Sequence, residues 1–169
     1  MTSLSTDALK PASAGIAAVR PARIDGQITG LAGELFVAAE LLKRGLQTSI
    51  TFGNAKAVDP FAFNVATGRC FTVQVKALRK SNYFPISVRR VEPAHVYVFT
   101  LLNAPGQPVQ YFIVPGAVLA GQPELFGKYF DDPKFPGIAP KSLAAFENAW
   151  QLFDEPGPAS LVGLAALGR

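Results

Sequence analysis

The spacing of apolar residues changes at Gly45. Between Thr29 and Arg44, apolar residues recur at three- and four-residue steps, which predicts an amphipathic helix with one apolar stripe: Leu31, Leu35, Ala38, Ala39 and Leu42. Gly45 then supplies a C-terminal cap for that helix. The segments after Gly45 are short apolar runs separated by turn residues, and such runs are typical of strands.

Five runs are predicted strands: Thr48–Phe52, Pro60–Val65, Arg69–Lys76, Val96–Leu101 and Gln110–Val114. The second and third read as a hairpin, and a turn signal at residues 103–106 joins the last two. A late helix is expected over about Ser142–Phe153, with one apolar side: Leu143, Phe146, Trp150 and Phe153. The order of elements predicts an α/β fold with a mixed central sheet flanked by helices.

The length of 169 residues fits one domain. We expect a flexible N-terminal arm over residues 1–24, the folded domain over 25–154, and a C-terminal tail over 155–169. Hydrophobic residues make up 49% of the chain and charged residues 17%. This composition favours extra apolar surface, which a homo-oligomer would bury.

Several classes of chemistry are excluded by residue counts. The single cysteine, Cys70, rules out an internal disulfide and a cysteine-based zinc site. The single histidine, His95, argues against a Ser-His-Asp triad and is assigned a structural role. Any metal is therefore expected to have oxygen ligands. The sequence shows no secretory signal and no apolar run of about 20 residues, so we expect a cytoplasmic protein.

The net charge of +4 and the pI of about 9.4 favour a polyanionic partner, although a mildly basic enzyme has the same balance. The distribution of charge is more informative. Between Pro60 and Val91 the chain has no acidic residue and six basic ones: Arg69, Lys76, Arg79, Lys80, Arg89 and Arg90.

Alternation along the strand 71–76 places Thr72, Gln74 and Lys76 on one face and the apolar residues on the other. If residues 67 and 68 form a two-residue loop, Asp59 lies opposite Lys76 and Phe61 lies opposite Gln74. Asp59, Gln74 and Lys76 would then converge. The simpler alternatives are solvent-facing side chains and an Asp59–Lys76 surface salt bridge.

Such a cluster suits Mg²⁺, a hard cation that prefers oxygen ligands. Asp59, Gln74 and the backbone carbonyl of Val75 would supply part of its coordination. Lys76 would orient or help deprotonate an attacking water, or neutralise charge in the transition state. Glu34, on the first helix among small and apolar residues, is the remaining polar candidate.

With these elements and candidate residues, the chain resembles the PD-(D/E)XK nuclease superfamily. The matching segments are GLAGELFVAAELLKRG, VDPFAFNVATGRCFTVQVK, NYFPIS, HVYVFTLLN, YFIVP and FENAWQLF, spanning roughly residues 30–153. The resemblance implies a restriction-endonuclease-like αβββαβ core. Among the members, archaeal Holliday junction resolvases are the most similar, and they imply a symmetric homodimer acting on branched DNA.

The resemblance also implies a function for four residues. Glu34, Asp59, Gln74 and Lys76 match the catalytic positions of a DNA endonuclease that depends on Mg²⁺ or Mn²⁺, with Glu34 reaching the ion directly or through a water. Two positions depart from the pattern. Gln74 is an amide where a carboxylate is usual, which weakens the cation site, and Pro60 follows Asp59 instead of preceding it.

The basic stretch is then expected to bind DNA through Arg79, Lys80, Tyr83, Arg89 and Arg90. Tyr83 and Phe84 either stack on unpaired bases or belong to the core, and the core is favoured for Phe84. Three hypotheses remain: a metal-dependent DNA endonuclease, a nucleic-acid-binding module that lost the chemistry, and an assembly subunit.

Overall fold

The computed structural model describes residues 26–49 and 61–154. The predicted arm over 1–24, the predicted tail over 155–169 and Asp59 lie outside these ranges. The described elements, in order, are α1 (Gly26–Lys43), β1 (Gln47–Ser49), β2 (Phe61–Asn64), β3 (Arg69–Leu78), β4 (Phe84–Pro85), η1 (Val88–Arg90), β5 (Val96–Leu101), β6 (Gln110–Pro115), α2 (Gly116–Gly121), η2 (Pro123–Phe126), β7 (Gly137–Ile138), η3 (Pro140–Phe146) and η4 (Trp150–Phe153), where η is a 3₁₀ helix.

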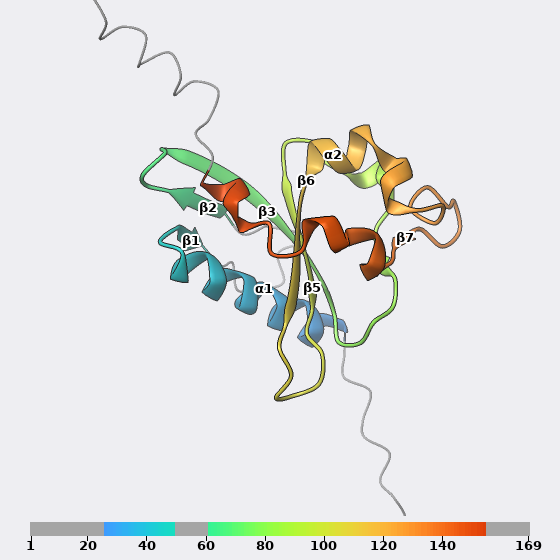
Figure 1. The fold of residues 1–169 in the computed structure, drawn as a ribbon, viewed down its shortest axis with the longest axis horizontal. Coiled ribbons are helices and arrows are strands. Elements are labelled where there is room, and N and C mark those ends of the chain that lie inside the picture. The colour runs from blue at the N-terminus through green and yellow to red at the C-terminus, as the bar shows by residue number, and fades with distance from the viewer. Residues whose placement is uncertain (1–25, 50–60, 155–169) are drawn as a thin grey trace, which may run out of the picture.

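The centre of the molecule is a five-stranded mixed sheet in the order β1-β2-β3-β5-β6 (Figure 1). The β3–β5 pair is parallel and the other neighbours are antiparallel. The predicted mixed α/β class is therefore confirmed. The finer αβββαβ order is not seen, because the chain between β3 and β5 forms β4 and η1 and contains no α-helix.

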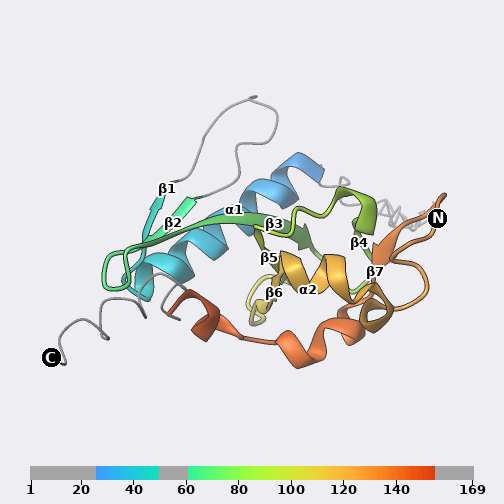
Figure 2. The ribbon, with the colours of Figure 1, turned by 90° about the horizontal axis from the view of Figure 1, so that it is seen from above.

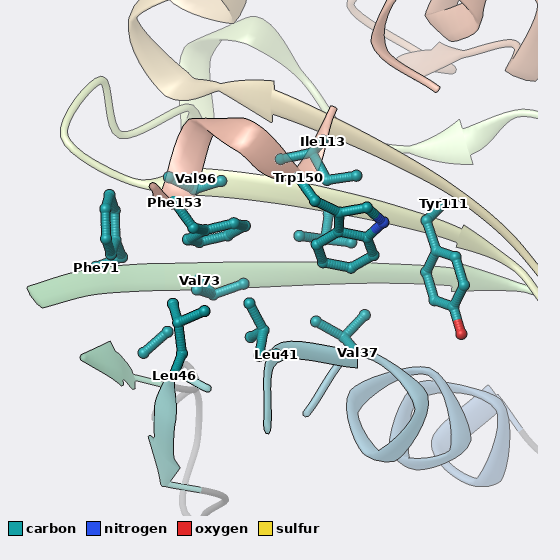
Figure 3. Packing of buried hydrophobic residues seen from close by; sticks show 12 residues of the cluster. Val37, Leu41, Leu46, Phe71, Val73, Val96, Tyr111, Ile113, Trp150 and Phe153 are labelled. Carbon is teal, nitrogen blue, oxygen red and sulfur yellow. The ribbon is translucent and has the colours of Figure 1, made fainter. Parts of the chain in front are cut away.

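Both faces of the sheet are covered. Figure 2 shows α1 on one face and α2 on the other. On the α1 face, Val37 and Leu41 pack against Val73 of β3 (Figure 3). Trp150 and Phe153 of η4 also belong to this first cluster.

The second cluster lies on the α2 face. Tyr97 and Phe99 of β5 and Phe112 of β6 point into it, and helices and loops from later in the chain cover them with Leu119, Phe126, Phe130, Ile138 and Leu143. Burial on both faces explains why β5 is almost entirely apolar, with Thr100 as its one small polar residue, and lacks the alternation of a half-exposed strand.

The structure corrects the predicted stripe of α1. The buried residues are Gly33, Val37, Ala38 and Leu41. Four of the five expected residues are instead exposed: Leu31, Leu35, Ala39 and Leu42. The reason is close packing at Gly33, where a methyl group would overlap that of Ala77 on β3. The helix turns its smallest residue to the strand, so the contact face is rotated from the predicted one.

The end of α1 agrees with the prediction. Gly45 has a φ of +83°, a conformation that glycine adopts without strain. Its N–H donates to the carbonyl of Leu42 at 2.9 Å, and the N–H of Leu46 donates to that of Leu41 at 3.1 Å. This is the Schellman pattern, and the accompanying contact between Leu41 and Leu46 is part of the first cluster.

The β2–β3 hairpin forms, but in a different register. Phe61 lies opposite Thr72, not Gln74. Four residues, 65–68, form the turn because Asn64 closes it: its Oδ1 accepts the N–H groups of Ala66 and Thr67 at 2.9 and 3.1 Å. The register moves by two residues, so Thr72, Gln74 and Lys76 keep their common face.

The predicted late helix is wrong as one continuous element. It is divided into η3 and η4, and Glu147 between them forms a β-bridge with Phe112. Its apolar residues serve different faces of the sheet, since Leu143 belongs to the second cluster and Trp150 to the first. A single straight helix cannot reach both clusters.

Within the described residues, no helix combines the length and apolar character needed to cross a membrane.

Candidate functional site

A cleft of about 850 Å³ opens on the α2 face of the sheet, beside the second cluster. Its floor is formed by β3 and β5, and its walls come from the segment around β4 and η1 and from the loop before β7. We call it the basic cleft; it is lined by Gln74, Lys76, Asn82, Tyr83, Pro85, Ile86, Ser87, Arg89, Arg90, Tyr97, Tyr129 and residues 132–136.

Gln74 and Lys76 reach this cleft because β3 alternates. In the parallel β3–β5 pair, Gln74 lies opposite Tyr97 and Lys76 opposite Phe99, and both aromatic residues belong to the second cluster. Residues paired in this way share a face of the sheet. Gln74 and Lys76 therefore lie side by side at the floor of the cleft. Both are half-buried, so their side chains remain accessible.

The wall formed by η1 carries two cations, Arg89 and Arg90. Two hydrogen bonds hold this wall in place. The N–H of Glu92 donates to the hydroxyl of Tyr97 at 2.9 Å, and the N–H of Val88 donates to the carbonyl of Phe130 at 3.3 Å. Arg89 also forms an ion pair with Asp131 at 3.5 Å. Both side chains are exposed, so this pair contributes little to the stability of the wall.

The opposite wall is a hydrogen-bonded loop over residues 129–136. The Oδ1 of Asp132 accepts the N–H of Phe135 at 2.7 Å and that of Lys134 at 2.8 Å. These hydrogen bonds from Phe135 and Lys134 lower the pKa of the Asp132 carboxyl below its ordinary value. The loop thus adds Lys134, a further cation, to the cleft.

Charge in the cleft is mostly positive. Among its described lining residues, Lys76, Arg89, Arg90 and Lys134 are cations and Asp132 is the one carboxylate. A concave surface of this sign favours phosphate groups, because each cation that meets a phosphate releases counterions.

Five of the predicted residues meet in this cleft: Gln74, Lys76, Tyr83, Arg89 and Arg90. Two expected DNA contacts do not line it. Arg79 donates from Nε to the hydroxyl of Thr29 at 3.1 Å and so ties β3 to the start of α1, and Lys80 is exposed outside the cleft. Phe84 is fully buried in the second cluster, as favoured.

The structure does not bring Glu34 into the cleft. Glu34 is half-buried on α1, and α1 packs on the opposite face of β3 through Gly33, which meets Val75 and Ala77. Val75 points its side chain to that same layer, so only its backbone could serve the cleft. Asp59 lies outside the described residues. The expected convergence of four side chains is therefore seen for Gln74 and Lys76 alone.

Sequence reasoning missed the loop at 129–136, which supplies Tyr129, Lys134 and Phe135. The signal available was the turn chemistry of DDPKFPG, in which two prolines and a glycine surround an aromatic residue and a lysine. Nothing local to that segment indicates that it lies beside β3.

The described residues fit a metal ion only in part. They hold no group of three or more histidine, cysteine or acidic side chains placed to bind one. In the cleft, Gln74 offers an amide oxygen, and Asp132 already accepts two N–H groups. A hard divalent cation needs more anionic oxygen than this.

Searches against protein-family models, curated proteins and solved structures return no match for this chain.

Proposed function

We propose that this chain is a DNA-processing protein, a PD-(D/E)XK-type endonuclease that hydrolyses phosphodiester bonds in the basic cleft. One observation carries the proposal. Gln74 and Lys76 lie two residues apart on β3 and line the same cleft, whose walls carry further cations. A polyanionic backbone fits that charge, and a lysine beside it is available for the chemistry.

Lys76 is the residue assigned to the reaction. In phosphodiester hydrolysis, a water oxygen bonds to phosphorus, the bond to the leaving sugar oxygen breaks, and negative charge builds on the phosphoryl oxygens. A half-buried ammonium group stabilises that charge more than an exposed one does, because less water screens it. Arg89, Arg90 and Lys134 would hold the neighbouring phosphates.

The metal dependence is the part of the proposal that rests on the sequence. The resemblance assigns Mg²⁺ or Mn²⁺ to Asp59 and Gln74, and the described residues supply only Gln74. Preference for branched or junction DNA and the homodimer likewise stay predictions. Sedimentation velocity tests the dimer; a chain that stays monomeric at micromolar concentration contradicts it.

A second candidate is a non-catalytic nucleic-acid-binding protein with the same cleft. The observation that favours it is the absence of an acidic cluster from residues 26–49 and 61–154. Both candidates bind nucleic acid, with affinity that falls as salt rises. They differ in cleavage.

The test uses labelled single-stranded, duplex and four-way-junction DNA with Mg²⁺, Mn²⁺ or a chelator. The endonuclease proposal predicts metal-dependent cleavage that Lys76→Ala slows about 100- to 1000-fold, the range found when one transition-state donor is removed. Lys141→Ala is the matched control, because Lys141 is an exposed cation on η3 outside the cleft.

Three outcomes separate the candidates. Cleavage lost in Lys76→Ala and kept in Lys141→Ala supports the endonuclease. Salt-dependent binding without cleavage of any substrate supports the non-catalytic protein. If the wild-type chain binds none of the substrates at 50 mM salt, both candidates are wrong.

A further inference from the structure

Three aromatic side chains line the basic cleft and remain in contact with solvent. Tyr83 is 46% exposed, Tyr129 40% and Phe135 81%. We call them the aromatic rim. Tyr83 precedes β4, whereas Tyr129 and Phe135 belong to the loop before β7, so the rim joins segments almost fifty residues apart in sequence.

The rim is held in place by the backbone around it. The two-residue β4–β7 pair joins the segments, and the N–H of Gly137 donates to the carbonyl of Tyr129 at 2.9 Å. Gly137 suits this close approach, because a methyl group at that position would lie 3.0 Å from the Cβ of Tyr83 and 3.1 Å from the carbonyl oxygen of Phe84.

Two of the three rings pack against each other, and Phe135 lines the same cleft. Tyr83 and Tyr129 meet edge to face, with ring centroids 5.3 Å apart and planes at 82°. Phe135 is placed by Asp132, which accepts its N–H at 2.7 Å. The most exposed ring in the cleft therefore belongs to a turn whose backbone is held by hydrogen bonds.

Flat apolar rings beside phosphate-binding cations fit one class of ligand. The cations Arg89, Arg90 and Lys134 share the cleft with the rim, and a nucleic-acid strand offers a phosphate to each cation and a base to each ring. In a duplex, every base face is covered by its neighbours, so a ring can stack only on a base that is unpaired and turned out. An apolar peptide would leave the cations without partners.

We propose that the aromatic rim stacks on unpaired bases and that the substrate class of the cleft is single-stranded or locally unpaired DNA. This inference rests on the proposed function, in that it takes a nucleic acid as the ligand. It goes further by assigning the recognition of strand state to Phe135, Tyr83 and Tyr129, separately from Lys76 and the arginines.

The test separates stacking from charge. Fluorescence anisotropy compares a labelled dT₁₂ strand with a 12-residue strand made of abasic tetrahydrofuran units, which has the same phosphates and no bases. A duplex of the same length is the third ligand. We expect dT₁₂ to bind at least tenfold more tightly than the abasic strand, with a similar dependence on salt.

Variants at Phe135 then assign the effect to the rim. Phe135→Ala should weaken dT₁₂ binding about 5- to 150-fold, which corresponds to about 1–3 kcal/mol for one stacked base. The same change should alter abasic-strand binding less than twofold, and Phe135→Trp should restore dT₁₂ binding. Leu125→Ala is the control, because Leu125 is an exposed apolar residue outside the cleft. Tyr83→Ala gives an independent variant.

Each outcome bears on the inference. Equal binding of dT₁₂ and the abasic strand, or no effect of Phe135→Ala and Tyr83→Ala, overturns stacking while leaving the basic cleft as a phosphate-binding site. Binding of the duplex but of neither strand overturns the inference and leaves the proposed function. Binding of none of the three ligands at 50 mM salt overturns both. Base-dependent binding without cleavage supports the inference and the non-catalytic candidate.

Discussion

Replacing Gly33 with alanine tests the packing that separates the two faces of β3. The added methyl group would overlap the methyl of Ala77 and lie 3.5 Å from a methyl of Val75. Both neighbours lie in the part of β3 that pairs with β5, so neither can move alone. Overpacking of this kind costs about 1–3 kcal/mol.

The helix itself gains from the same substitution. Alanine is favoured over glycine by about 1 kcal/mol in a helix interior, so the net loss for Gly33→Ala is about 0–2 kcal/mol. Gly30→Ala is the matched control, because a methyl group at Gly30 meets nothing within 4 Å. The difference between the variants isolates the overlap at about 1–3 kcal/mol. For a chain of this size that corresponds to about 2–12 °C in Tm.

Urea unfolding and thermal melts followed by circular dichroism measure both variants. Adding Ala77→Gly to Gly33→Ala removes the methyl that is overlapped, so a double-mutant cycle should show favourable coupling of about 0.5–3 kcal/mol. Equal stability of Gly33→Ala and Gly30→Ala, or no coupling in the cycle, would refute the close packing of α1 on β3.

Three further predictions concern charged and titrating groups. Asp132→Asn keeps an oxygen that accepts the two loop N–H groups and removes a negative charge, so DNA affinity should rise, whereas Asp132→Ala should release the loop and lower dT₁₂ affinity in anisotropy assays. Burial raises the pKa of Tyr111, Glu40 raises it further and Arg44 lowers it. Its ultraviolet titration should therefore lie above pH 10. The contribution of Tyr111 to the free energy of unfolding should be fully present below about pH 10 and be lost as pH rises through the folded-state pKa. Glu34→Gln should slow cleavage less than tenfold, because α1 lies on the far face of β3; a loss as large as that of Lys76→Ala would show that this carboxylate reaches the reaction.

Much of the sheet could be predicted from the sequence. The limits of β5 agree with the predicted strand, since both of its faces are buried and its apolar run is continuous. The hairpin was predicted from its flanking runs, but its register depended on how the turn closes. The Asn64 side chain closes the turn, because its Oδ1 accepts hydrogen bonds from two backbone N–H groups of the turn.

The cleft could be predicted from its β3 floor and from the basic segment that carries Tyr83, Arg89 and Arg90, but not from the loop before β7. Alternation places Gln74 and Lys76 on the same face, and the structure agrees. The second wall depends on the β4–β7 pair, which is two residues long on each strand and leaves no periodic trace in the sequence. The same limit explains α1, whose buried face was set by contact with β3 at Gly33 and not by the positions of its leucines.

The floor of the cleft and its η1 wall are fixed relative to each other through Tyr97. This residue lies opposite Gln74 in the parallel register, which sets its place along the sheet. Its hydroxyl accepts the N–H of Glu92, just after the segment that carries Arg89 and Arg90. Arg89, Arg90 and the Gln74–Lys76 pair are therefore placed by the same buried ring. Under the proposed function, a strand whose phosphates contact these arginines would also lie in the cleft that Lys76 lines.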